Sequence, residues 1–347
     1  MNQDPIPPGG RAWRRLARLV AVVVTLAALT SVVLLPAVVP VGLLATNAIQ
    51  QLGVPPVGRA LERPPERSLV YAADGTVLAR LHATEDRVVI PLSGIPPDVR
   101  DAVLAIEDAR FYRHGALDYR VLGRALLADL YGGGIRQGGS TITQQYVKQT
   151  VTGASVTLRR RLAEAIGAIQ LERRLSKDRI LEAYLNEVYF GEGAYGIEAA
   201  AEHYFSEPAR ELTLAEGAAL AAAIASPARF RPTAGREALA RRNLVLGRMA
   251  ALGFAPGSEV AAALRQPLRT HLHRSTRRYP FFVQVVERQL LRDHALDGTL
   301  GPAGSAARER ALFEGGLAIH TTLGTGRQRL AEAAVAEDLG AGGPQAA

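Results

Sequence analysis

The chain has 347 residues, of which 48% are hydrophobic and only 5% aromatic. This length allows one large domain or two ordinary ones, and the Ala- and Leu-rich composition favours a mainly helical protein. The sequence contains no cysteine, so disulfide bonds, thiolate catalysis and cysteine-bound zinc are excluded. The net charge of +8 suits an anionic partner, such as nucleic acid, an acidic lipid or a phosphate-bearing substrate. Arginine carries nearly all of the positive charge, and a compositional bias explains the excess equally well.

The first feature along the chain is an apolar segment at residues 19–45, long enough to span a bilayer as a helix. A basic tail at residues 1–18 precedes it, so the positive-inside rule predicts a cytoplasmic N-terminus and an extracytoplasmic remainder. The alternative is a cleaved signal peptide, but the apolar run is longer than such peptides have and no Ala-x-Ala site closes it. We expect an uncleaved transmembrane anchor.

Residues 46–95 are predicted to form a linker and a β-hairpin region. Residues 69–71 and 77–79 are apolar stretches that flank Asp74-Gly75, a dipeptide typical of tight hairpin turns. A third strand is predicted at residues 88–90, which read Val-Val-Ile.

Residues 96–255 have apolar positions at helical spacing and are predicted to form the main domain. Glycines at 132–134 and 138–139 interrupt this pattern and predict a flexible loop. Helices are predicted at 158–171 and 178–189, a turn at the glycines 191, 193 and 196, and an Ala-rich buried helix at 214–224.

Residues 256–347 are expected to begin a second region that is incomplete. Helices are predicted at 281–291 and from 327 to 339, a loop at 298–304 and a strand at 317–323. The last residues read Ala-Gly-Gly-Pro-Gln-Ala-Ala, which is typical of a truncated boundary.

Candidate chemistry begins with Glu107 and Asp108, which follow an apolar run. A carboxylate at the edge of an apolar element tends to have a raised pKa, as a general acid or base requires. A solvated helix end with ordinary surface acids is the alternative, and this segment alone favours it.

The next segment reads Gly-Gly-Ser-Thr-Ile-Thr-Gln-Gln at 138–145, with Lys148 close behind. Ser140 and Thr141 predict a helix N-cap, and helix N-termini attract anions. Lys148 would then lie about two turns into the helix. The alternative is a capped helix without a ligand.

A third segment places Arg160 and Arg161 four and three residues before Glu164. On a helix these side chains share a face, either as a weak surface ion pair or as a cationic site for a diphosphate. The histidines lack metal-ligand spacing, and no Gly-x-Ser-x-Gly elbow or P-loop occurs. The residues alone therefore suggest a sugar-phosphate reaction.

Five segments in order resemble the motifs of the family 51 peptidoglycan glycosyltransferases, the glycosyltransferase module of class A penicillin-binding proteins. The second is the Gly-Gly-Ser-Thr-Ile-Thr-Gln-Gln run, without a mismatch. The others are Glu107-Asp108-x-x-Phe111-x-x-His114, Arg160-Arg161-x-x-Glu164, Tyr189-Phe190-Gly191-x-Gly193-x-Tyr195-Gly196 and Arg241-Arg242-x-x-Val245-Leu246.

The resemblance implies a mainly α, lysozyme-like glycosyltransferase domain with a small β-hairpin region, behind one N-terminal transmembrane helix. It also implies a mobile, membrane-embedded lobe around residues 126–150. The substrates would be lipid II and the growing glycan strand. Cell-wall synthesis or division proteins are further candidate partners, and no nucleic acid is expected because the charge is spread along the chain.

The resemblance also implies residue roles. Glu107 would deprotonate the acceptor hydroxyl, and Glu164 would assist the leaving group, with a divalent cation (Mg²⁺ or Mn²⁺) left open beside it. Lys148, Arg160 and Arg161 would hold the diphosphate. The remaining expected substrate-binding residues are Asp108, Phe111, His114, Ser140, Thr141, Gln144 and Gln145.

The chain departs from the family pattern at a few positions. Arg161 stands where lysine is usual, and Tyr146 and Gln149 replace the usual Leu and Asn. No serine is followed by lysine three residues later, so the transpeptidase nucleophile motif is missing. The chain is then either a fragment of a two-domain enzyme or a version that has lost the second domain, and the C-terminal sequence favours the fragment. Two rival interpretations stay open: a lysozyme-like enzyme that cleaves finished glycan, and a catalytically silent membrane-anchored scaffold.

Overall fold

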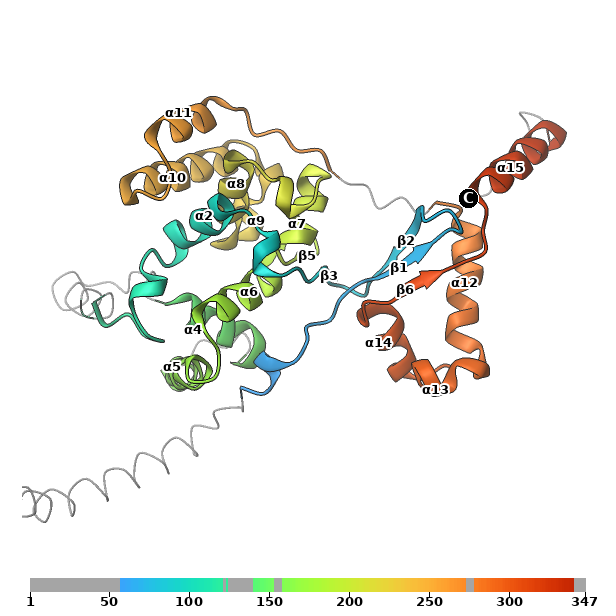
Figure 1. Cartoon of the computed structure of the whole chain (residues 1–347), viewed down its shortest axis with the longest axis horizontal. Helices are drawn as coiled ribbons and strands as arrows, with labels where there is room; N and C mark the ends of the chain where they lie inside the picture. The colour runs from blue at the N-terminus through green and yellow to red at the C-terminus, as the bar shows by residue number, and fades with distance from the viewer. Residues whose placement is uncertain (1–56, 121–122, 124–139, 153–157, 273–277, 340–347) are drawn as a thin grey trace, which may run out of the picture. The chain divides into compact units, whose positions relative to one another are not determined.

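The computed structural model describes residues 57–120, 123, 140–152, 158–272 and 278–339. Within these ranges the chain is mainly helical, as predicted, with two small three-stranded sheets (Figure 1). No helix among the described residues is long and apolar enough to cross a membrane. The expected basic tail and anchor at 1–45 and the glycine-rich loop at 132–139 lie outside the described residues.

The helical core is built around α8 (Leu214–Ile224), which packs against α2 (Pro97–Glu107) and α10 (Arg236–Leu252) (Figure 1). A helix that is apolar on all sides must be buried, and eight of the eleven residues of α8 are. Gly217 permits the close approach of α8 to α2, because an added Cβ atom would lie 2.8 Å from Val99 Cγ2. The predicted buried helix at 214–224 is confirmed.

A second group of helices supplies the polar residues of the candidate site. α4 (Ile142–Val147) continues into a π-helical turn at Lys148–Thr152. α5 (Leu158–Glu172) passes close to α4, because Gly167 on α5 has no side chain where a Cβ atom would lie 2.8 Å from Val147 Cγ1. α6 (Lys177–Glu187) ends two residues before the predicted end at 189, because the chain enters a strand there.

The small sheet beside these helices has the strand order β3–β5–β4, with β3 at Asp86–Arg87, β5 at Ala194–Tyr195 and β4 at Tyr189–Gly191. The predicted strand at 88–90 is therefore wrong. The backbone N–H of Val89 donates to the Glu66 carboxylate and that of Ile90 to the Asn186 side chain, so these groups are unavailable for strand pairing.

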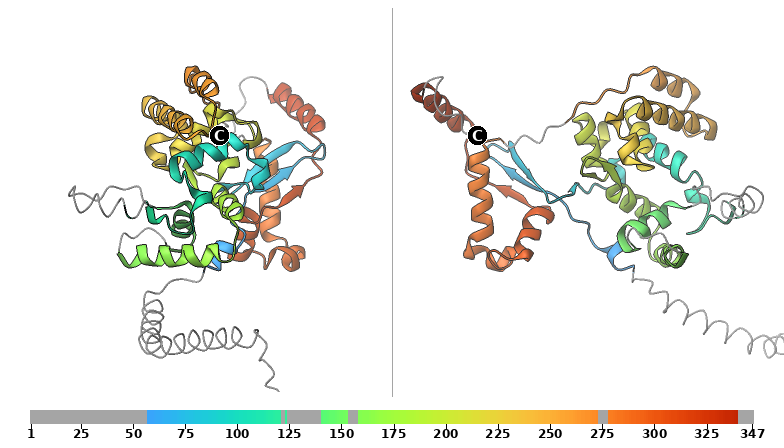
Figure 2. Two further views of the ribbon diagram at one scale, coloured as in Figure 1. Left: turned by 60° about the vertical axis from the view of Figure 1, so that its left-hand side comes forward. Right: turned by 180° about the vertical axis from the view of Figure 1, so that it is seen from behind.

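The second sheet joins residues from both ends of the described chain, in the order β2–β1–β6 (Figure 2). β1 (Ser68–Tyr71) and β2 (Val77–Leu81) form the predicted antiparallel hairpin, and β6 (Ala318–His320) pairs parallel to β1. β6 is shorter than the predicted strand at 317–323. Val283 of α12 (Pro280–Arg292) is buried against this sheet. The sheet and α12 thus share a second hydrophobic core, separate from the helical core.

The remaining elements complete the two cores. α11 (Gly257–Arg265) packs into the helical core through Val260 and Ala263. The loop predicted at 298–304 begins as a helical turn, α13 (Asp297–Leu300). The other helices are α7 (Ile197–Phe205), α9 (Pro227–Phe230), α14 (Ala306–Glu314) and α15 (Thr325–Leu339), and the 3₁₀ turns are Arg59–Leu61, Leu92–Gly94, Phe111–Arg113, Ala209–Glu211, Pro232–Ala234 and His294–Leu296.

Candidate active site

A cleft of about 490 Å³ lies at the C-terminal end of α2 and brings together residues that are far apart in the sequence. α2 supplies Glu107, α4 and its flanks supply polar and cationic residues, and α5 supplies Glu164. Six of the predicted site residues line this cleft: Glu107, Ser140, Gln144, Gln145, Lys148 and Glu164.

Glu107 is the last residue of α2 and is largely enclosed at the cleft wall. Burial raises the pKa of its carboxyl, because desolvation disfavours the charged form. A hydrogen bond from Gln145 and the positive charge of Arg241 oppose this rise, whereas the charge of Asp108 adds to it, and the net direction is upward. A carboxyl with a raised pKa is suited to proton transfer near neutral pH.

Gln145 connects Glu107 to the protein interior. Its Nε2 atom donates to Glu107 Oε2 at 2.9 Å, and its Oε1 atom accepts from the Tyr184 hydroxyl at 3.0 Å. Tyr184 lies on α6 and is fully buried. Both ends of the Gln145 amide are therefore engaged by protein groups.

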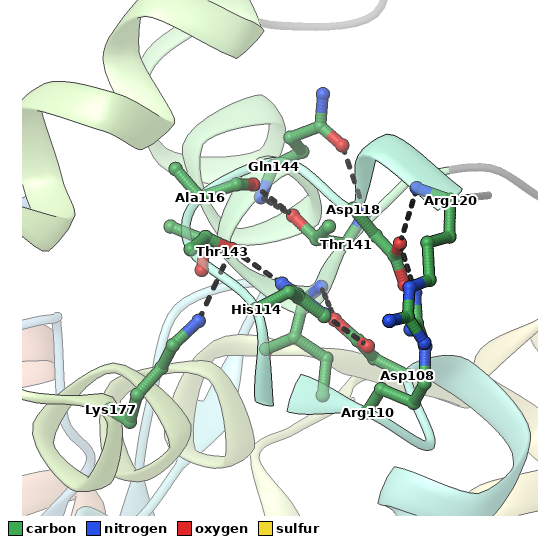
Figure 3. A network of polar contacts seen from close by, with 12 residues as sticks. Asp108, Arg110, His114, Ala116, Asp118, Arg120, Thr141, Thr143, Gln144 and Lys177 are labelled. Carbon is green, nitrogen blue, oxygen red and sulfur yellow. Dashed lines mark hydrogen bonds and ion pairs between the residues drawn. The ribbon is translucent and has the colours of Figure 1, made fainter. Parts of the chain in front are cut away.

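Asp108, the neighbour of Glu107, points into the protein and is not among the residues that line the cleft. Its Oδ1 atom lies 2.7 Å from His114 Nε2, and its Oδ2 atom accepts from the backbone N–H of Ile142 at 3.2 Å (Figure 3). Ile142 is the first residue of α4. The carboxylate of Asp108 thus occupies the N-terminal end of α4, where the sequence led us to expect an anionic ligand.

Thr141 is the N-cap of α4 and is buried. Its hydroxyl donates to the Ala116 carbonyl at 2.8 Å and accepts from the Gln144 backbone N–H, while the Gln144 side chain accepts from the Thr141 backbone N–H (Figure 3). The predicted N-cap is confirmed, and the reciprocal bonds make it a capping box. The Thr141 hydroxyl is therefore occupied by protein groups, whereas Gln144 also lines the cleft.

Phe111 lies behind the cleft and is buried to 1% exposure. The ammonium of Lys177 lies 4.3 Å from the centre of its ring and donates to Glu172 at 2.7 Å. Glu172 also accepts from the Thr143 hydroxyl at 2.6 Å. Phe111 is thus part of a packed, polar-bonded support under α4, and it does not line the cleft.

The three cations expected to hold a diphosphate lie on two elements. Lys148 is at the junction between α4 and the π-helical turn and lines the cleft. Arg160 and Arg161 are on the first turns of α5, ahead of the buried Glu164 on the same helix, and neither is among the residues that line the cleft. The prediction that Arg160, Arg161 and Glu164 lie on one helix is confirmed, as is the place of Lys148 about two turns after the N-cap of α4.

The residues around Glu164 do not form a metal site by themselves. The parts of the chain that are described contain no group of three or more His, Asp or Glu side chains that could hold a metal ion. Magnesium commonly binds one or two carboxylates and completes its shell with water and substrate phosphates.

Two residues that act on Glu107, directly or through Gln145, were not predicted from the sequence. Arg241 of α10 lines the cleft and acts electrostatically on Glu107. The fifth motif contains Arg241, and that motif was the available signal. Tyr184 is 39 positions from its partner Gln145 and carries no local signal.

Comparisons with known proteins agree with the motifs. The transglycosylase family model matches residues 74–250. Penicillin-binding protein 1F of Bacillus subtilis (strain 168) is 38% identical over 221 residues, which cover 63% of this chain and 31% of the relative. Penicillin-binding protein 1A of Aquifex aeolicus (strain VF5) is 36% identical over 280 residues, 80% of this chain and 36% of the relative.

The crystal structure of penicillin-binding protein 1A from Haemophilus influenzae aligns with a TM-score of 0.42 and 22% identity, over 80% of this chain and 30% of that chain. The matched part of this chain spans about a third of the length of the curated relatives. The family match at 74–250 contains both Glu107 and Arg241. The chain belongs to the transglycosylase family, the family 51 peptidoglycan glycosyltransferase module of class A penicillin-binding proteins.

Proposed function

We propose that this protein is a membrane-anchored peptidoglycan glycosyltransferase that polymerises lipid II into β-1,4-linked glycan strands and releases polyprenyl diphosphate. One observation carries the proposal. The Glu107 carboxyl, whose pKa is raised by burial, shares a single cleft with the cation Lys148 and a second carboxyl, Glu164.

Glu107 is the general base. Its Oε2 atom is held by Gln145, and its Oε1 atom accepts no hydrogen bond from another residue within the described ranges, so Oε1 can take the proton. The proton comes from the 4-hydroxyl of the acceptor sugar as that oxygen attacks the anomeric carbon of the donor. The bond from this carbon to the diphosphate breaks, and the configuration inverts.

The leaving diphosphate gains negative charge in the transition state, and fixed cations stabilise such charge best. Lys148 supplies one cation at the cleft wall. Arg160 and Arg161 do not line the cleft, and we expect them to add their charge from α5 when the diphosphate is bound. Glu164 assists departure of the leaving group. Arg161 replaces a point charge with a planar fork that can bind two phosphate oxygens, so we expect function to be retained.

Other expected residues act at two levels. Ser140, Gln144 and Gln145 line the cleft and contact the sugars. The four others, Asp108, Phe111, His114 and Thr141, shape the cleft from behind, through the contacts described above.

The proposed location follows from the sequence. Residues 1–18 form a cytoplasmic tail, 19–45 the anchor and 46–95 the linker and hairpin region. Residues 96–255 form the extracytoplasmic, lysozyme-like catalytic domain. Because α11 packs into its core, only the part of 256–347 beyond α11 is assigned to the transpeptidase side. An anchored catalytic domain would meet its lipid-linked substrate at the membrane surface.

A glycan-cleaving enzyme is the second candidate, because two carboxyls in one cleft, Glu107 and Glu164, are also what a glycoside hydrolase uses. A hydrolase has no need of a diphosphate site, and Lys148 in the same cleft therefore favours the transferase. A silent scaffold would need neither the raised pKa of Glu107 nor a lined cleft.

One assay separates these functions. The full chain in detergent is given labelled lipid II and, separately, finished glycan, and the products are resolved on a gel. A ladder of glycan strands from lipid II is expected. Short fragments from finished glycan would show that the protein is a hydrolase and not a transferase. No product from either substrate would support the catalytically silent scaffold.

A further inference from the structure

A buried tyrosine completes a hydrogen-bonded chain that ends at Glu107. The Tyr184 hydroxyl donates to Gln145 Oε1 at 3.0 Å, and Gln145 Nε2 donates to Glu107 Oε2 at 2.9 Å. The chain links three elements, because Tyr184 lies on α6, Gln145 on α4 and Glu107 at the end of α2. Tyr184 is 0% exposed and does not line the cleft, so it can act on the cleft only through Gln145.

The polarity of this chain follows from the chemistry of its two ends. An ionised carboxylate can only accept, so Glu107 requires the NH₂ group of Gln145. The amide oxygen must then face Tyr184, whose hydroxyl donates to it. An amide without this contact would have no partner for its oxygen on the protein side and would be held at Glu107 by its NH₂ group alone.

We propose that Tyr184 is a positioning residue for the glycosyl transfer, because its buried hydroxyl binds the amide oxygen of Gln145 and so holds the NH₂ group in place against the ionised base. The name of the reaction rests on the proposed function, whereas the hydrogen-bonded chain itself exists in the resting protein. Tyr184 therefore sets the protonation behaviour of Glu107 without touching substrate.

The electrostatics of the site agree with this role. Burial, and then the charges of Glu107 and Asp108, raise the pKa of Tyr184 well above its ordinary value. The hydroxyl thus stays a neutral donor over the whole working range of pH. The hydrogen bond from Gln145 lowers the pKa of Glu107 and partly offsets the larger effect of burial. Loss of the oriented amide should therefore raise the pKa of Glu107 further.

The test uses the full chain with Tyr184→Phe. Glutamate labelled with ¹³C at the side-chain carboxyl lets NMR follow the titration of Glu107, whose signal is identified by its loss in Glu107→Gln. We expect the midpoint to rise by about half to one pH unit in Tyr184→Phe. In the polymerisation assay, the pH at which kcat reaches half of its maximum should rise by the same amount, while kcat recovers at alkaline pH and KM stays nearly unchanged.

Tyr204→Phe is the matched control. Tyr204 is also 0% exposed in the helical core, and its hydroxyl donates to a backbone carbonyl, that of Phe190, at 3.1 Å. The control should leave the titration of Glu107 and the pH profile unchanged. An equal shift in both variants would reduce Tyr184 to a structural role and overturn the proposal.

A double-mutant cycle tests the route through Gln145. In the Gln145→Ala background, Tyr184→Phe should cause no further change in the midpoint of Glu107, because the connecting amide is gone. A shift that persists in that background, or an unchanged midpoint in folded Tyr184→Phe, would overturn the proposal.

A second variant applies if Tyr184→Phe does not fold. Difluorotyrosine at position 184 keeps the ring volume and strengthens the donor, so the midpoint of Glu107 should fall, and an unchanged or raised midpoint would overturn the proposal. The NMR titration needs no turnover. If the wild-type chain showed no polymerase activity, the proposed function would be wrong. The effect of Tyr184 on the titration of Glu107 could still be measured.

Discussion

The carboxylate of Asp108 accepts a hydrogen bond from the backbone N–H of Ile142 at 3.2 Å and so supplies the negative charge at the N-terminal end of α4. The two residues are 34 positions apart and belong to different motifs. Their contact joins the end of α2 to the start of α4. Because Glu107 precedes Asp108 and Gln145 lies in the first turn of α4, this link places Glu107, the proposed general base, beside its amide donor.

Asp108→Asn tests this link. The substitution removes the charge that faces both His114 and the α4 backbone but keeps the shape of the side chain. We expect the free energy of unfolding to fall by about 1.5–3 kcal/mol, the usual size for a hydrogen bond to a charged group. Urea unfolding measures the change. Asp101→Asn makes the same substitution on α2 at a half-buried position, and a loss as large as that of Asp108→Asn would contradict the account.

Thr141 and Ser140 are neighbours with different expected roles. Thr141→Ala should lower the free energy of unfolding by about 1–2 kcal/mol because the N-cap of α4 is lost, and Thr141→Ser should restore most of it. Ser140→Ala should leave stability unchanged and raise the KM for lipid II, since Ser140 is exposed at the cleft. Thermal unfolding and polymerisation kinetics separate the two. Equal thermal effects of Thr141→Ala and Ser140→Ala would be inconsistent with these roles.

The close approach of α8 to α2 predicts a further pair of variants. Gly217→Ala places a methyl group 2.8 Å from Val99 Cγ2, so we expect a loss of stability of about 1–3 kcal/mol from overpacking. Gly247→Ala on α10 meets nothing within 4 Å and should be neutral or stabilise by up to about 1 kcal/mol, because alanine favours a helix. Denaturant unfolding decides, and a stable Gly217→Ala would show that the two helices can separate.

The raised pKa of Glu107 predicts a cost in stability. Its folded-state pKa lies above the unfolded value, so its stabilising contribution is present below the unfolded pKa and is lost as pH rises through the folded one. Glu107→Gln stays neutral at every pH. The variant should therefore match the wild type in acid and have a higher Tm at pH 8. A wild type that is the more stable protein at pH 8 would contradict the direction of the shift.

Local patterns were enough to predict several parts of the fold. The α8 helix is an alanine run that starts behind the capping residue Thr213 and ends before Pro227, and both signals are local. The β1–β2 hairpin follows from Asp74-Gly75, where Gly75 adopts a φ of 81°. The strand predicted at 88–90 failed because Glu66 and Asn186, which are distant in sequence, bind the backbone N–H groups of Val89 and Ile90.

The sequence predicted which residues belong to the site better than it predicted which of them line the cleft and which support α4. Motif order indicated that Glu107, Gln145, Lys148 and Glu164 belong together, and they share one cleft. The sequence could not show that the polar groups of Asp108 and Thr141 are engaged in holding α4. That division depends on which way each side chain points, and tertiary contacts decide this.

The central claim is that Glu107 is the general base of glycan polymerisation, and Glu107→Gln in the lipid II assay tests it most directly. Glu198→Gln is the control, because burial also raises the pKa of Glu198, on α7, where its carboxylate accepts from the Ala209 backbone N–H. We predict that Glu107→Gln lowers polymerisation by about a hundredfold or more while Glu198→Gln keeps the wild-type ladder. Full activity in folded Glu107→Gln would contradict the assignment.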